Sequence, residues 1–432
     1  MHRYFASSAK TACAAALVLP LSFTAGASGA HAAPREAPDV PGSTQSLPLQ
    51  SIGSPSDRAA GAAEQGVPQR EVRPFSLVGV VWDDAGAELH GTVRVRTRAV
   101  GSGAWSVWQQ LETHNLEHAA DPGTAESESA TVRGSTAPLW VGDSDAVEVR
   151  VQADGTDQRA VLPQGLRLQL VDPGDDPADA TEPDTNTGTG VPGPEEPGRA
   201  PSGLLEIPAL TRSETEAEAV ATGELAPGAE PYIGPRPRII TRKGWGADES
   251  LREKTFVYTD QVKAAFVHHT ATGNNYTCAQ APSVLRSIYR YHVESSGWRD
   301  IGYNFAVDKC GNIYEGRAGG VAKPVLGAHT LGFNTNSTGI AVLGTYSLTK
   351  PPTAAVTAIA KLTAWKLGLY GVDPRGRTTL TSGGSGKYAK GVKVSLNVIS
   401  GHRDGFTTDC PGDRLYNQLG TARNAAATYQ GR

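Results

Sequence analysis

The feature that most constrains the fold of this 432-residue chain is a segment without aromatic residues, 173–231. It is acidic and rich in Pro, Gly and Thr, as in PGDDPADATEPDTNTGTGVPGPEEPG. Such a composition buries too little apolar surface to fold alone and is typical of an extended spacer. We therefore expect separate folded domains on either side of an acidic, disordered linker at residues 173–235.

The two parts of the chain differ in charge. Residues 1–235 carry 15 basic and 32 acidic side chains, a balance of −17, and residues 236–432 carry 25 basic and 12 acidic ones, a balance of +13. The total of −4 hides this difference. The basic part is expected to attract anionic polymers, and salt weakens such an attraction.

The N-terminus has the pattern of an export signal. Residues 1–32 begin with a weakly basic stretch, continue with the apolar run ACAAALVLPLSFTAG, and end in Ala-His-Ala, which fits a cleavage site. Pro20 interrupts the run, which is also shorter than the roughly 20 residues that span a bilayer. We predict a signal peptide; an N-terminal core helix is the alternative. Residues 33–70 are predicted to be a disordered lead-in.

Cysteine usage agrees with export. Cys13 lies in the signal, so the mature chain would keep Cys278, Cys310 and Cys410. Three cysteines allow one disulfide, as expected in an oxidising compartment, and leave one sulfur over. A leftover thiol in an exported protein typically serves as an intermolecular partner, a reactive group or a metal ligand.

Residues 71–172 contain short β-branched and aromatic segments separated by Gly, Asp and Pro. In TVRVRTR, valines alternate with arginines, which is the pattern of a strand with one buried face. We predict an all-β, sandwich-like antiparallel domain. Its tryptophans form either a sugar-stacking platform or, more commonly in a small sandwich, part of the core; they are Trp82, Trp105, Trp108 and Trp140.

From residue 236 the chain alternates strand and helix signals. AAFVHHT and TGIAVLGTY are typical of buried strands, and DIGYNFAVDKCGNIYEGR has the pattern of a hairpin. Apolar residues recur at helical spacing in SVLRSIYRYHVESSG and in PPTAAVTAIAKLTAWKLGLYG, each of which ends at a glycine. Residues 236–432 are therefore predicted to form an α/β domain with a central mixed sheet flanked by helices.

Three residues of this domain have side chains suited to zinc. His268 ends an apolar strand, His402 begins the loop GHRDGFTTDC, and Cys410 lies in the same loop. Two histidines and one cysteine leave the fourth position of a tetrahedral zinc for water, as in catalytic sites. The spacing alone leaves an alternative open: two ordinary histidines, with Cys410 paired to another cysteine.

The C-terminal part also resembles a known family. Five blocks in order cover nearly all of residues 239–415: RKGWGAD, FVHHTAT, YRYHVESSGWRDIGYNFAVDKCGNIYEGR, GAHTLGFNTNSTGIAVLGTY, and GHRD leading to DCPGD. In this order they resemble the peptidoglycan recognition protein family. The phage-type zinc-dependent N-acetylmuramoyl-L-alanine amidases share the fold of this family. GHRD alone is common, but the ordered set is specific.

The resemblance implies that one zinc ion is bound by His268, His402 and Cys410. Members that only bind the cell wall typically lack this cysteine, and this chain keeps it. Cys278 and Cys310 flank the predicted helix and hairpin, and we predict a disulfide between them; reduced, buried thiols are the alternative.

The resemblance also implies roles around the zinc. Tyr303 matches a tyrosine that hydrogen-bonds the attacking water or the reacting carbonyl, and Thr408 lies where a hydroxyl donates to the developing oxyanion. Arg317 would pair with a stem-peptide carboxylate, and Asn334 would contact substrate. His329 is either a substrate contact or a structural histidine.

The implied function is that of an exported zinc hydrolase, which cleaves the amide between N-acetylmuramic acid and L-alanine in peptidoglycan. The alternative is a wall-recognition or adhesion protein with weak or no catalysis. A general zinc peptidase is disfavoured because the sequence has no HExxH motif. We expect a secreted, wall-associated monomer that binds peptidoglycan and anionic wall polymers, without a nucleic-acid partner or a membrane span.

Overall fold

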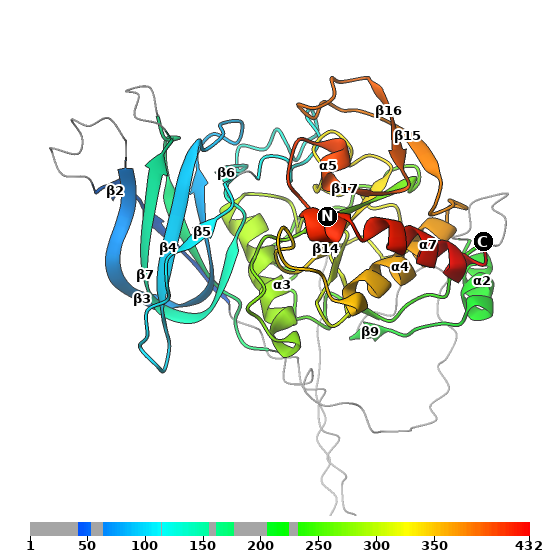
Figure 1. Cartoon of the computed structure of the whole chain (residues 1–432), viewed down its shortest axis with the longest axis horizontal. Coiled ribbons are helices and arrows are strands. Elements are labelled where there is room, and N and C mark those ends of the chain that lie inside the picture. The colour runs from blue at the N-terminus through cyan, green and yellow to red at the C-terminus, as the bar shows by residue number, and fades with distance from the viewer. Residues whose placement is uncertain (1–41, 53–63, 114, 155–160, 177–204, 224–231) are drawn as a thin grey trace, which may run out of the picture. The chain divides into compact units, whose positions relative to one another are not determined.

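The computed structural model describes residues 42–52, 64–113, 115–154, 161–176, 205–223 and 232–432 (Figure 1). The predicted signal peptide, residues 1–32, lies outside the described residues, as does more than half of the predicted linker. Within the described residues, no helix is long and apolar enough to cross a membrane.

The N-terminal domain is an antiparallel sheet in the order β1-β8-β3-β7-β4-β5, with β2 and β6 also paired to β3. Its strands are β1 Ser43–Pro48, β2 Gln50–Ser51, β3 Glu64–Trp82, β4 Gly91–Ala99, β5 Gln109–Leu111, β6 Gly134–Ser135, β7 Leu139–Ala153 and β8 Arg167–Asp172. The 19-residue β3 shifts register against β7 at three places, so the sheet bends at these irregularities. One apolar core, with Val80, Val93, Val149 and Leu170, joins strands from both ends of this sheet. The all-β prediction is therefore correct.

The predicted disordered lead-in, residues 33–70, is wrong where the chain is described. Strand β1 pairs along its whole length with β8, and β3 begins at Glu64. An edge strand is held mainly by backbone hydrogen bonds, so β1 needs few apolar residues: Leu47 packs against the core, and Leu49, which follows β1, lies within it. The predicted linker, 173–235, also contains regular elements, which are β9 Glu206–Ile207 and α2 Arg212–Ala221.

The C-terminal domain is built on a mixed sheet in the order β17-β11-β14-β12-β13-β10-β9. β11 is parallel to both β17 and β14, β12 is parallel to β14, and the pairs β12–β13 and β10–β9 are antiparallel. The strands are β10 Ile239–Ile240, β11 Ala264–His269, β12 Phe305–Val307, β13 Ile313–Glu315, β14 Ser337–Val342 and β17 Ile399–Gly401, with a separate hairpin of β15 Arg377–Thr381 and β16 Lys393–Asn397.

Helices cover both faces of this sheet, as the sequence predicts (Figure 1). They are η2 Cys278–Gln280, α3 Ala281–Arg290, the π-helical turn η3 Tyr291–Ser295, α4 Thr353–Gly368, α5 His402–Gly405, α6 Asp413–Tyr416 and α7 Leu419–Gln430. Side chains alternate along β11: Ala265 and Val267 pack with α4 and α7 on one face. Ala264 and Phe266 point to the other face, and the same alternation directs His268 there. A disulfide joins Cys278 to Cys310, the pairing that the sequence predicts.

The two domains share an apolar core rather than being joined only by a linker. Leu77 and Val171 of the N-terminal sheet pack in one cluster with Val284 and Ile288 of α3. Tyr291 belongs to the same cluster, and its hydroxyl donates to backbone carbonyls of the N-terminal domain. Contacts between the domains therefore include buried side chains and can position loops of one domain in the other.

Candidate metal centre

Parallel pairing brings two histidines to one edge of the C-terminal sheet. β11 and β17 run side by side, with Val267 opposite Gly401. His268 and His402 each follow one of these paired residues, so both lie where the strands end. Their ring centroids are 4.5 Å apart, and both side chains are fully buried.

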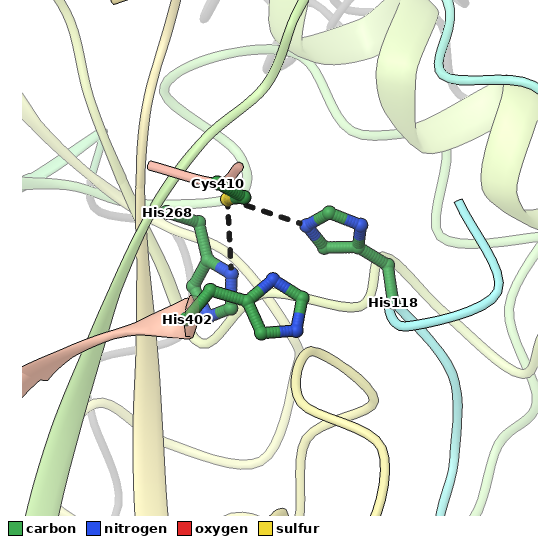
Figure 2. Close-up of side chains that lie close together, drawn as sticks. All are labelled: His118, His268, His402 and Cys410. Carbon is green, nitrogen blue, oxygen red and sulfur yellow. Dashed lines mark hydrogen bonds between the residues drawn. The ribbon is translucent and has the colours of Figure 1, made fainter. Parts of the chain in front are cut away.

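Cys410 reaches the same point from the loop after α5. The backbone N–H of Arg403 donates to the Cys410 carbonyl at 3.0 Å, which ties the loop to the helix. The Cys410 Sγ lies 3.8 Å from His268 Nδ1 (Figure 2). The structure therefore brings together the three residues that the sequence predicts as metal ligands.

A fourth residue, His118, lies in this group, although its own segment carries no metal-binding pattern. His118 Nε2 is 3.8 Å from Cys410 Sγ (Figure 2), and ligand atoms of the four residues all lie within 4.8 Å of one another. It comes from the connection between β5 and β6, in the other domain. Ligand spacing within one domain cannot reveal a residue whose position depends on the contact between domains.

The donor set fits zinc. At Zn–S of about 2.3 Å and Zn–N of about 2.05 Å, a tetrahedral ion holds sulfur and nitrogen about 3.6 Å apart, close to the observed 3.8 Å separations. Among the described residues, both ring nitrogens of His402 are buried without a hydrogen-bond partner. Buried polar atoms are normally paired, so these nitrogens are available to an ion.

Burial dominates the electrostatics of the group. Together with a smaller contribution from His269, it lowers the pKa of His118 to about 3, and it holds the pKa values of His268 and His402 well below the ordinary value of 6.5. Burial also raises the pKa of the Cys410 thiol well above 9.0. The histidines are therefore neutral, which is the form that binds a metal.

Tyr303 and Thr408, the predicted catalytic residues, adjoin this group. The Tyr303 ring lies 5.5 Å from that of His268 and 5.9 Å from that of His118, centroid to centroid. The Thr408 hydroxyl donates to Glu117 Oε1 at 2.8 Å and accepts from the Cys410 N–H at 3.1 Å. Both side chains are close enough to act on a molecule bound beside the metal ligands.

His329 lies behind His268 rather than in the cleft. It is fully buried, and its Nδ1 is 3.3 Å from His268 Nε2 and 3.0 Å from Thr330 Oγ1. These contacts orient the His268 ring so that Nδ1 points towards Cys410, as outer contacts commonly do for metal ligands. Of the two interpretations of His329 left open above, the placement favours the structural one.

The other two predicted substrate-binding residues are occupied by acidic side chains of the N-terminal domain. Arg317 forms two hydrogen bonds of 2.8 Å with the carboxylate of Glu126. Asn334 Nδ2 donates to Asp121 Oδ1, also at 2.8 Å. The acidic partners, like His118, lie between β5 and β6.

Two cavities adjoin the metal ligands. One of about 700 Å³ is lined by His118, His269, Tyr303 and Cys410, and one of about 420 Å³ is lined by His118 and Phe406 on the other side. His118 contributes to both, so the segment that carries it lies between them.

Comparison with known proteins places this chain in a family. Residues 258–413 match the family described as N-acetylmuramoyl-L-alanine amidase. Peptidoglycan-recognition protein SC2 of Drosophila melanogaster is 33% identical over 186 residues, which are 43% of this chain and 86% of that protein. The chain belongs to the peptidoglycan-recognition protein family.

Other relatives are similar to about half of the chain. Human N-acetylmuramoyl-L-alanine amidase is 31% identical over 224 residues, which are 51% of this chain but 34% of that protein. A solved structure, Drosophila PGRP-LB wild-type, is 25% identical with a TM-score of 0.34, over 42% of this chain and 92% of that one.

The N-terminal domain has its own match. Residues 32–188 match the family described as Rv3811 N-terminal galactose-binding domain-like. The match begins well before residue 71, in agreement with the strands that the structure places in the predicted lead-in.

Proposed function

We propose that this peptidoglycan-recognition protein is an exported, zinc-dependent N-acetylmuramoyl-L-alanine amidase. One observation carries the proposal: the Cys410 sulfur lies 3.8 Å from His268 Nδ1, in a buried group that also holds His402. A domain that only recognises peptidoglycan has no need of a thiol there. The match of residues 258–413 to the amidase family and the similarity to an amidase relative support the same conclusion.

His268, His402 and Cys410 would hold the zinc. When bound, the ion supplies Lewis acidity, which lowers the pKa of water and polarises a carbonyl. An amide needs both effects because it is a weak electrophile with a poor leaving group.

The surrounding residues would orient the amide and stabilise charge. The Tyr303 and Thr408 hydroxyls are proposed donors to the oxyanion that develops when the amide is attacked. Arg317 would bind a stem-peptide carboxylate through its two parallel N–H groups, and Asn334 would contact the same substrate. His329 would hold the orientation of His268.

The second candidate is wall recognition with little or no catalysis. It is favoured by the similarity to proteins named for peptidoglycan recognition. It also accounts for the basic C-terminal part, which would bind anionic wall polymers with or without chemistry.

The amidase function is tested with purified muropeptides. The zinc-loaded chain should release stem peptides that begin with alanine, and a chelator should stop the release. A Cys410→Ala variant should bind zinc at least about 100-fold more weakly and lose turnover, because it lacks a ligand rather than an outer contact.

His90→Ala is the matched control. This histidine lies in the N-terminal domain with a side chain 73% exposed, so the variant should keep both zinc and turnover. If zinc is bound and the cleft is accessible, but no stem peptide that begins with alanine is released from any wall type, the remaining candidate function is wall recognition.

A further inference from the structure

The connection between β5 and β6 enters the cleft of the C-terminal domain at the metal ligands. His118 Nε2 approaches Cys410 Sγ at 3.8 Å, and its ring lies 4.5 Å from that of His402. The carboxylate of the neighbouring Glu117 accepts a hydrogen bond from the Thr408 hydroxyl. A carboxylate oxygen therefore occupies the place where the proposed oxyanion donor would meet its substrate.

The same segment continues along the predicted substrate positions. Asp121 accepts from the N–H of Gly332 at 2.8 Å and from the side chain of Asn334 at 2.8 Å. Five residues later comes Glu126, whose carboxylate pairs with Arg317; the two side chains are only 6% and 7% exposed. Arg317 therefore already holds a carboxylate by the bidentate geometry proposed for a stem peptide.

We infer that residues 115–126 are an internal inhibitor of this site: His118 is the fourth protein ligand of the metal, and the acidic side chains take the places of substrate anions. The inference rests on the proposed function for the identity of the excluded substrate. The described conformation is then a closed form in which no ligand position remains for water.

The chain on both sides of residues 115–126 is held by the packed domains. The closed position of the segment therefore depends on this packing. β5 ends at Leu111 before it. After it, the N–H of Arg133 donates to the Ser296 carbonyl, and the Thr131 hydroxyl donates to Gly297. The cavities on its two sides leave room for displacement, so opening requires the segment to leave the cleft and not the domains to separate.

The ligand assignment is tested by X-ray absorption of the zinc-loaded full chain. The spectrum should fit three imidazole nitrogens and one sulfur. In His118→Ala it should fit two imidazoles, one sulfur and one oxygen, whereas His90→Ala should match the unaltered chain. A shell of two imidazoles and one sulfur in the unaltered chain would overturn the assignment.

The exclusion of substrate is tested by calorimetric binding of muropeptides and by turnover. His118→Ala and Glu126→Gln should each bind at least about tenfold more tightly than the unaltered chain, because the competent conformation is more populated. Turnover at limiting substrate should rise by a similar factor. Weaker binding and lower turnover in His118→Ala would instead make His118 part of the working site and overturn the inference.

Two further outcomes are distinguishable. If the opened variants bind muropeptides more tightly but cleave none, the proposed catalysis fails and the internal inhibitor stands. If Glu126→Gln does not fold because Arg317 is left buried without a counter-charge, His118→Ala decides: its Nδ1 has no hydrogen-bond partner among the described residues, so truncation removes little that holds the fold.

Discussion

At the scale of single residues, a substitution at Tyr303 distinguishes a role in catalysis from a role in metal binding. Its ring packs beside His268 and His118 but is not among the grouped ligands. Tyr303→Phe keeps the packing and removes only the hydroxyl. We expect kcat on muropeptides to fall by about 10²–10³-fold, the cost of losing one oxyanion donor, with zinc content unchanged.

The measurement pairs steady-state kinetics with metal analysis of the same samples, in a chain opened by His118→Ala so that substrate can enter. Tyr388→Phe is a suitable control, since this tyrosine makes an edge-to-face contact with Phe333 outside the metal group. An undiminished kcat in Tyr303→Phe would remove the hydroxyl from the mechanism.

The metal ligands of the C-terminal domain could be predicted from the sequence, and the ligand from the N-terminal domain could not. His268 lies near the end of β11, and His402 directly follows the parallel strand β17. The pattern of a buried strand in the sequence shows where such a strand ends. His118 depends on a contact between the two domains, with Cys410 292 residues away in the chain, and nothing in its own segment, NLEHAA, distinguishes it from an ordinary surface loop.

At the scale of elements, the packing of η3 on β3 joins the domains. An added Cβ at Gly79 of β3 would lie 2.3 Å from the Tyr291 hydroxyl. That hydroxyl is fixed by hydrogen bonds to Val80 and Thr136, so the ring cannot move without losing them. Gly79→Ala should therefore lower the free energy of unfolding by about 1–3 kcal/mol, as overpacking does.

Gly420→Ala in α7 provides the contrast. Beyond its chain neighbours and its own helix backbone, no atom of the described residues lies within 4 Å of the added Cβ, and alanine favours a helix, so stability should stay level or rise by about 0.5–1 kcal/mol. Urea unfolding of both variants is the measurement. Equal effects of the two substitutions would mean that the contact between η3 and β3 does not contribute to stability.

Elements also show why the sequence prediction was better for the C-terminal domain. Buried strands and amphipathic helices carry strong periodic signals, and the mixed sheet between helices follows from them. Strand β1 carries little such signal because β8 holds it through the backbone, so a polar, proline-containing segment was mistaken for a disordered one.

At the scale of the whole molecule, the two oppositely charged parts pair with each other. Glu126 of the acidic part binds Arg317 of the basic part, and Asp176 binds Arg286. The net charge of −4 thus arises partly from charges that neutralise one another across the contact between domains. The proposed attraction of anionic polymers would strengthen when residues 115–126 leave the cleft.

The Glu126–Arg317 pair should make stability depend on pH. Burial raises the pKa of the Glu126 carboxyl, but the charge and hydrogen bonds of Arg317 and Arg299 together outweigh it, so the folded value lies below the ordinary 4.5. A lowered folded pKa means that the stabilisation is fully present above the unfolded value and is lost as the pH falls through the folded one.

Glu126→Gln should therefore be less stable than the unaltered chain by about 3–5 kcal/mol at neutral pH, the usual cost of breaking a buried pair. The difference should shrink as the pH falls below 4.5, where the unaltered chain also loses its carboxylate. Urea unfolding of both chains from pH 3 to pH 7 measures this difference. A difference that stays constant across this range would mean that the pair is not ionised in the folded protein, and that Arg317 does not hold Glu126 as it would hold a substrate carboxylate.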